Sequence, residues 1–145
     1  ETDMGCDIHL HAEIKLNGKW EHYSKLEINR DYNLFAKMAG VRNYDDLPVL
    51  CEPKGMPSDV SVVTALDYRH WGPDAHSASW FNAREIALLC ATKEVKDYEA
   101  RLRGGGNWHS FPGYLFGNDW ACWKNNPLNY PSEIEDIRWV FWFDS

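Results

Sequence analysis

The sequence lacks the paired cysteines that small zinc sites use. Its four cysteines are widely scattered and include no Cys-x-x-Cys pair, so a zinc knuckle is not supported; they are Cys6, Cys51, Cys90 and Cys122. A signal peptide and a long apolar run are missing as well. We therefore expect a cytoplasmic protein whose thiols are free.

Positive charge is scarce too. The chain has 15 Lys and Arg against 22 Asp and Glu, which gives a formal net charge of −7. Polymeric nucleic acid is therefore not an expected partner, and no membrane is expected either. Aromatic residues, by contrast, are abundant, and the eight Trp, seven Tyr and six Phe supply both a core and rings that could stack on a ligand.

Two familiar catalytic motifs are absent. No Gly-x-Ser-x-Gly elbow occurs, so an acyl-transfer serine enzyme is not expected. The glycine run at residues 104–106 lacks the Gly-Lys-Ser/Thr ending of a P-loop, and it follows a predicted helix instead of preceding one. We expect one globular domain over residues 4–145, with Met4 as the natural start and residues 1–3 as additions.

The stretch from Cys6 to Tyr23 predicts a β-hairpin with one polar face. Apolar and polar residues alternate strictly from Asp7 to Ile14, which indicates a half-buried strand. Asn17-Gly18 suits a two-residue type I′ turn, and that turn would pair Leu16 with Lys19 and Glu13 with His22. The polar face would then hold three histidines and two carboxylates, namely Asp7, His9, His11, Glu13 and His22.

The remaining pattern predicts an α+β fold. Helices are expected over residues 31–39, from Ser58 to about Tyr68, and from Ala83 to about Arg103 with an interruption near Thr92. Residues 70–80 are expected to form a loop, and residues 107–131 either a long structured loop or short strands. Residues 137–143 are apolar on both faces and predict a central strand. We expect an antiparallel or mixed sheet, made of the N-terminal hairpin and this strand, packed with two to three helices.

The hairpin's polar face is the first candidate site. Asp7, His9 and His11 have the spacing of possible ligands of a divalent metal of unknown identity, or they act as acid–base groups. Glu13 and His22 would orient them or bind the ligand. Alanine at His9 or His11 would then remove function at little cost in stability. The alternative is a polar sheet face under a helix, with its histidines satisfied by hydrogen bonds.

The segment around His76 is the second candidate site. It would lie before a helix N-terminus, where a phosphate is favoured, with His76 as a catalytic group facing it. Ser77 and Ser79 would donate hydroxyl groups and Trp80 would offer a stacking surface. Lys54 would supply a cation beside another helix start. A serine-rich capping turn is the alternative for this segment.

Several short segments together resemble a family of small proteins encoded by phages and prophages. They are Met4-Gly5-Cys6-Asp7-Ile8-His9, Tyr32-x-Leu34-Phe35-Ala36-x-Met38-Ala39-Gly40-Val41-Arg42, Gly55-x-Pro57-x-Asp59, His76-Ser77-x-Ser79-Trp80 and Phe141-x-Phe143-Asp144. The resemblance implies an accessory protein in the host cytoplasm. Such proteins often blunt host defences, including by binding or cleaving nucleotide second messengers, and this is an analogy from context.

Three functions stay open at this point. The first is an enzyme that hydrolyses a phosphodiester or pyrophosphate in a small nucleotide, in the manner of a phosphodiesterase. The second is a non-catalytic sponge that sequesters such a nucleotide. The third is a structural or protein-binding role in which the polar face is incidental. The sequence leaves the ligand and the oligomeric state undetermined.

Overall fold

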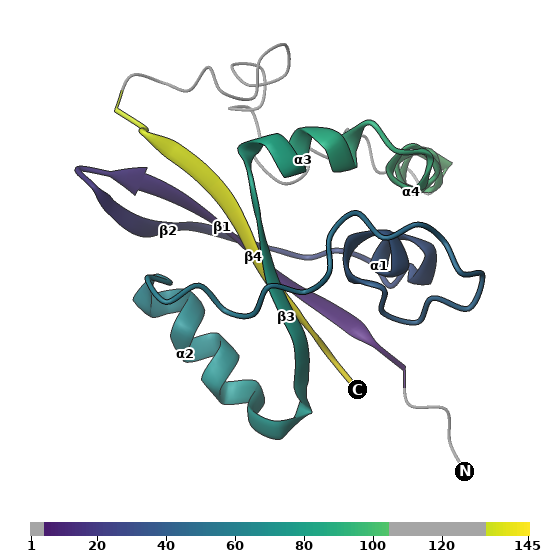
Figure 1. Cartoon of the computed structure of the whole chain (residues 1–145), viewed down its shortest axis with the longest axis horizontal. Helices are drawn as coiled ribbons and strands as arrows, with labels where there is room; N and C mark the ends of the chain where they lie inside the picture. The colour runs from purple at the N-terminus through teal and green to yellow at the C-terminus, as the bar shows by residue number, and fades with distance from the viewer. Residues whose placement is uncertain (1–4, 105–132) are drawn as a thin grey trace.

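The computed structural model of the chain describes residues 5–104 and 133–145. The described residues form four strands, four α-helices and one 3-10 turn (Figure 1). In chain order they are β1 (Asp7–Leu16), β2 (Lys19–Leu26), α1 (Tyr32–Ala39), α2 (Val62–Trp71), η1 (Gly72–Asp74), β3 (Ala75–Asn82), α3 (Ala83–Cys90), α4 (Lys93–Gly104) and β4 (Asp136–Asp144). The expected α+β fold is confirmed.

The strands form one antiparallel sheet in the order β2-β1-β4-β3. The C-terminal strand β4 therefore lies beside the N-terminal strand β1, as the sequence predicted, and its apolar residues are buried on both faces. The hairpin register is also confirmed, since Leu16 pairs with Lys19 and Glu13 pairs with His22. Asn17 and Gly18 have φ angles of 51° and 77°, as a type I′ turn requires.

The helices cover the two faces of the sheet unequally (Figure 1). α1, α3 and α4 lie on one face, where the even-numbered residues of β1 and the odd-numbered residues of β4 are buried among side chains such as Phe35, Ile86 and Tyr98. α2 lies on the other face, the polar face of the hairpin. This polar face is thus an interior layer between β1 and a helix.

Local sequence signals account for the helix ends. Asp31 caps α1 by accepting a hydrogen bond from the Leu34 amide at 3.1 Å, and Gly40 ends it with a φ of +73°. Asn82 and Glu85 form the expected capping box of α3. The interruption expected near Thr92 is also present, because α3 ends at Cys90 and α4 starts at Lys93.

Two expectations about single elements were wrong. Residues 75–82 form strand β3 instead of a loop, because they pair with the open edge of β4, and their Ser, Ala and Asn residues give no strand pattern of their own. α2 starts at Val62 with Ser61 as its N-cap, and not at Ser58. The described residues hold four helices where two to three were expected, because the interruption near Thr92 divides the third predicted helix into α3 and α4. The loop predicted for residues 107–131 lies outside the described residues.

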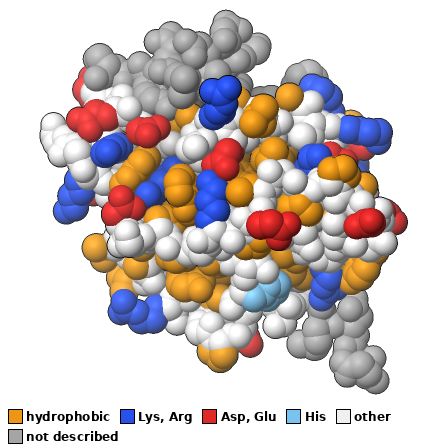
Figure 2. Space-filling view, viewed as in Figure 1, with side chains coloured by type: hydrophobic (Ala, Val, Ile, Leu, Met, Phe, Trp, Pro, Cys, Tyr) orange, Lys and Arg blue, Asp and Glu red, His pale blue; other side chains and the backbone are white. Residues whose placement is uncertain are grey.

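On the face of the molecule that Figure 2 shows, acidic and basic side chains are interspersed, with hydrophobic ones between them. Three of the exposed hydrophobic residues belong to α2, where Val62, Val63 and Leu66 are each more than half exposed. None of the described helices combines the length and the apolar composition that are needed to cross a bilayer.

Candidate functional site

Glu13 is fully buried beneath the start of α2 and pairs with Arg138 of β4. Its Oε1 lies 2.9 Å from Nε and 2.8 Å from Nη2 of Arg138. Its Oε2 accepts hydrogen bonds from the Ser61 amide at 3.1 Å, the Ser61 hydroxyl at 2.5 Å and the Thr64 hydroxyl at 2.7 Å. A carboxylate at a helix N-terminus is also favoured by the helix dipole. Glu13 thus holds α2 on the sheet.

The arginine of this pair reaches further groups. Its Nη1 donates a hydrogen bond to Asp59 Oδ1 at 2.8 Å, and its guanidinium carbon lies 4.1 Å from the centre of the Trp20 ring. A hydrogen bond to Arg138 is the main reason why the pKa of Asp59 is lowered. Arg138 therefore links the interior ion pair to the surface segment that precedes α2.

Asp67, His11 and His22 form a chain of hydrogen bonds across the same layer. His11 Nε2 lies 2.8 Å from Asp67 Oδ2, and His11 Nδ1 lies 2.9 Å from His22 Nε2. Only 1% of His11 is exposed, and its ring stacks on Trp142 with 5.3 Å between the ring centres. Lys25 Nζ approaches the same Asp67 oxygen at 3.0 Å. We call Asp67, His11 and His22 the relay.

Burial sets the protonation of the relay. It lowers the pKa of His11, although the hydrogen bond that His11 donates to Asp67 opposes this, and it lowers the pKa of His22. Burial alone would raise the pKa of Asp67, but hydrogen bonds from Lys25 and His11 outweigh it and lower that pKa. At neutral pH the relay therefore consists of one carboxylate and two neutral imidazoles.

These charge states assign the tautomers. A carboxylate only accepts hydrogen bonds, so His11 carries its proton on Nε2 and its Nδ1 is an acceptor. His22 must then donate from Nε2 to His11 Nδ1. The lone pair on His22 Nδ1 remains, and this atom has no hydrogen-bond partner within the described part of the chain. The relay thus turns His22 into a base at its outer end.

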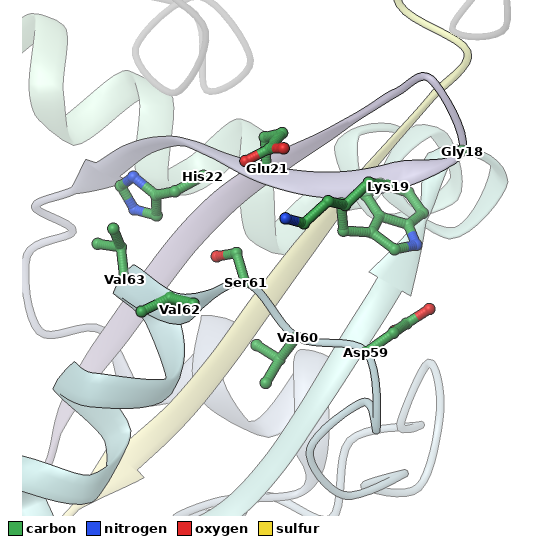
Figure 3. Close-up of a pocket in the computed structure, with 10 residues that line it drawn as sticks. Gly18, Lys19, Glu21, His22, Asp59, Val60, Ser61, Val62 and Val63 are labelled. Carbon is green, nitrogen blue, oxygen red and sulfur yellow. The ribbon is translucent and has the colours of Figure 1, made fainter.

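His22 lines a pocket of about 470 Å³ between β2 and the segment that leads into α2 (Figure 3). Lys19 and His22 come from β2, and Ser61, Val62 and Val63 face them from the start of α2. Lys19 is exposed, and its amine has no ion pair among the residues that the structure describes. We call this space the relay pocket. It offers a base, a cation and the Trp20 ring on one strand.

The other residues predicted on the hairpin lie apart from the relay. Asp7 pairs at the surface with Nε and Nη2 of Arg30, each at 3.0 Å, and the hydrogen bond from Arg30 lowers the pKa of Asp7. His9 bonds to Asp144 at 2.7 Å, and its ring lies 4.2 Å from that of Trp71. Within residues 5–104 and 133–145, no three His, Cys, Asp or Glu side chains converge as metal ligands.

The residues of the second predicted site form two separate groups along β3, one around His76 and one around Ser79 and Lys54. His76 Nε2 lies 2.9 Å from Ser145 Oγ, and its Nδ1 lies 3.0 Å from Ser77 Oγ. Ser79 is buried, and its hydroxyl accepts a hydrogen bond from the Lys54 amide at 3.1 Å. Lys54 is paired with Glu85 at 2.6 Å, and its amine lies 3.8 Å from the centre of the Trp80 ring. Neither group contacts the relay through a described hydrogen bond.

Comparison of the chain with protein-family models, curated proteins and solved structures gave no match. The sequence did not point to Asp67 as a partner of His11, or to Lys19 as a residue that lines the pocket. A signal for Asp67 existed, because Ser61, Thr64 and Asp67 recur every three residues and form one polar stripe on α2.

Proposed function

We propose that this protein binds a small nucleotide in the relay pocket and hydrolyses its phosphodiester or pyrophosphate bond with His22 as the acid–base group. One observation carries the proposal: the hydrogen-bonded relay Asp67–His11–His22 ends at a pocket with an imidazole nitrogen that has no described partner. In other catalytic relays a carboxylate fixes the tautomer of the histidine that acts as the base. Here Asp67 would fix the tautomer of His11, and His11 that of His22, so that His22 could take a proton from a water molecule.

The chemistry that follows is a proton transfer. His22 Nδ1 would accept a proton from the water that attacks phosphorus and would later return it to the leaving oxygen. The positive charge that develops on His22 would be stabilised through His11 by the Asp67 carboxylate. Lys19 would balance the charge of the phosphate, and the Trp20 ring would contact the organic part of the ligand.

Sequestration without turnover is the second candidate, and the lowered pKa of His22 favours it. Burial makes this imidazole a weaker base than a free histidine, which reduces the driving force for taking a proton from water. The same pocket would then hold the nucleotide through Lys19 and Trp20 and leave it intact.

The setting is part of the proposal and rests on the resemblance to phage proteins. We infer an accessory protein that acts in the host cytoplasm on a nucleotide second messenger of host defence. The free thiols of Cys6, Cys51 and Cys90 are compatible with a reducing compartment.

The test is incubation of the protein with a panel of cyclic dinucleotides and ADP-ribose-type nucleotides. His22→Gln is compared with His70→Gln, which makes the same change at an exposed histidine of α2 outside the relay pocket. We expect turnover by the wild type and by His70→Gln, with a loss of at least tenfold in His22→Gln. A chelator arm is included because the sequence also allowed a divalent metal at Asp7, His9 and His11.

The other possible results of this test would favour a different function. Stoichiometric retention without turnover, weakened when Lys19 is changed to Ala, would establish sequestration. Equal turnover by His22→Gln and the wild type would refute the role of the relay. Neither binding nor turnover with any nucleotide would leave the structural or protein-binding role.

A further inference from the structure

A second pocket of about 550 Å³ opens beside the relay pocket on the same face of the sheet. It lies between the segment Met56–Asp59 and the strands β3 and β4, and Trp80 and Arg138 line it. Trp20 and Asp59 line both pockets, so the two spaces adjoin. We call this second space the tryptophan pocket.

The two indole rings of the tryptophan pocket are each held by a cation. Lys54 Nζ lies 3.8 Å from the centre of the Trp80 ring, and the Arg138 guanidinium lies 4.1 Å from that of Trp20. Both cations are fixed in turn, because Lys54 bonds to Glu85 and Arg138 is 4% exposed and bonds to Glu13. The rings are therefore preorganised, which lowers the entropic cost of stacking a ligand on them.

Polar groups of both kinds border the rings. The Asp59 carboxylate is largely exposed and, beyond its bond to Arg138, has acceptor capacity left. Asn82 uses its side-chain oxygen to cap α3, so its amide NH₂ remains as a donor, with no partner among the described residues. A flat ring that carries both amino groups and ring acceptors would match this set, and nucleobases have this chemistry.

We propose that the tryptophan pocket is the base-binding subsite of the proposed nucleotide site. The base stacks on Trp80 and Trp20, while the phosphate extends past Asp59 into the relay pocket toward Lys19 and His22. The base taken there carries an exocyclic amino group, as adenine, guanine and cytosine do, because the Asp59 carboxylate only accepts hydrogen bonds. Uracil fits less well, since its single N3–H donor lies between two carbonyl oxygens that a carboxylate repels. The position of the phosphate in this inference rests on the proposed function. Binding of the base alone can be measured with ligands that have no phosphate.

The test uses nucleosides, which have no phosphate. Adenosine, guanosine, cytidine and uridine are titrated by calorimetry into the wild type, Trp80→Leu, Trp80→Phe and His70→Gln. We expect one of the amino-bearing nucleosides to bind, uridine to bind more weakly, and Trp80→Leu to lose roughly 5- to 100-fold in affinity. Trp80→Phe should recover part of this loss, and His70→Gln, which changes an exposed histidine that lines neither pocket, should bind the nucleoside as the wild type does.

The outcomes separate this inference from the proposed function. Nucleoside binding that depends on Trp80, in a protein that cleaves no nucleotide, would support the subsite and refute hydrolysis. Nucleotide turnover that depends on His22 while folded Trp80→Leu keeps its KM would refute the subsite alone. Absence of nucleoside binding to the wild type would also overturn the subsite. If Trp80→Leu does not fold, the nucleoside affinities of Trp80→Phe and Asp59→Asn are measured instead. The subsite would be refuted if both variants kept the affinity of the wild type and its preference for the amino-bearing nucleoside over uridine.

Discussion

Replacement of Glu13 by Gln should destabilise the protein strongly although the side chain keeps its shape. Glu13 is fully buried and accepts from Arg138 on one oxygen and from Ser61 and Thr64 on the other. An amide has one acceptor and one donor end, so its NH₂ group must face donors whichever way it is turned. Arg138, itself 4% exposed, would also lose its interior counter-charge.

The magnitude follows from these contacts. Breaking a buried ion pair costs about 3–5 kcal/mol. Asp59 still pairs with Arg138 but is largely exposed, so we expect the lower end, a loss of about 3 kcal/mol in the free energy of unfolding. For a chain of this size each kcal/mol lowers Tm by about 2–4 °C, which gives a drop of roughly 6–12 °C.

The assay is urea and thermal unfolding followed by circular dichroism. Glu21→Gln is the matched control, because Glu21 lies on β2 and is exposed, and we expect it to unfold within about 0.5 kcal/mol of the wild type. The double change Glu13→Leu with Arg138→Met should recover part of the loss, since no buried charge is then left unpaired and Asp59, which loses its partner, is largely exposed to water. A Glu13→Gln variant as stable as Glu21→Gln would refute the buried pair.

Three further predictions concern the relay. Asp67→Asn should lower kcat at least tenfold with a smaller change in KM, because an amide does not fix the tautomers of His11 and His22 as a carboxylate does. A kcat and KM equal to those of the wild type would contradict this. The free energy of unfolding should fall as the pH drops below about 6.5, because the pKa values of His11 and His22 are lowered in the folded state and the unfolded chain therefore binds more protons at acidic pH. Urea unfolding at pH 7.5 and 5.5 measures this difference, and equal free energies at the two pH values would contradict the prediction. His11→Ala should cost about 1–3 kcal/mol, against the small cost expected from an exposed side chain, because it leaves His22 Nε2 without its acceptor and Asp67 with Lys25 alone. A melting curve unchanged from the wild type would refute the burial of His11.

Much of the fold could be predicted because its signals are local. The alternation in β1, the Asn17-Gly18 turn and the apolar β4 each specify an element within a few residues. β3 could not be found in this way, since its sequence has little strand propensity and the strand exists because β4 offers it an edge. Long-range pairing decided this element.

The candidate site was predictable only in part for the same reason. The hairpin register brings His22 near His11 and Glu13, and that much follows from the sequence. The hydrogen-bond partners of Glu13 and His11 depend on where α2 crosses the sheet. In the structure α2 places Ser61 beside Glu13 and Asp67 beside His11. The polar strand face thus lies under a helix with His11 held by hydrogen bonds, the arrangement that the sequence left open as the alternative to a ligand site.

The most direct test of the central claim is nitrogen-15 NMR of protein labelled in its histidines, recorded between pH 5 and 8 with and without nucleotide. We predict that His22 at pH 7 is neutral with its proton on Nε2, that its pKa lies below the ordinary value of about 6.5, and that a bound nucleotide shifts its Nδ1 resonance. Asp67→Asn should mix the two tautomers. A proton on Nδ1 of His22 in the wild type, or an Nδ1 resonance that no nucleotide of the panel moves, would contradict the relay as the functional site.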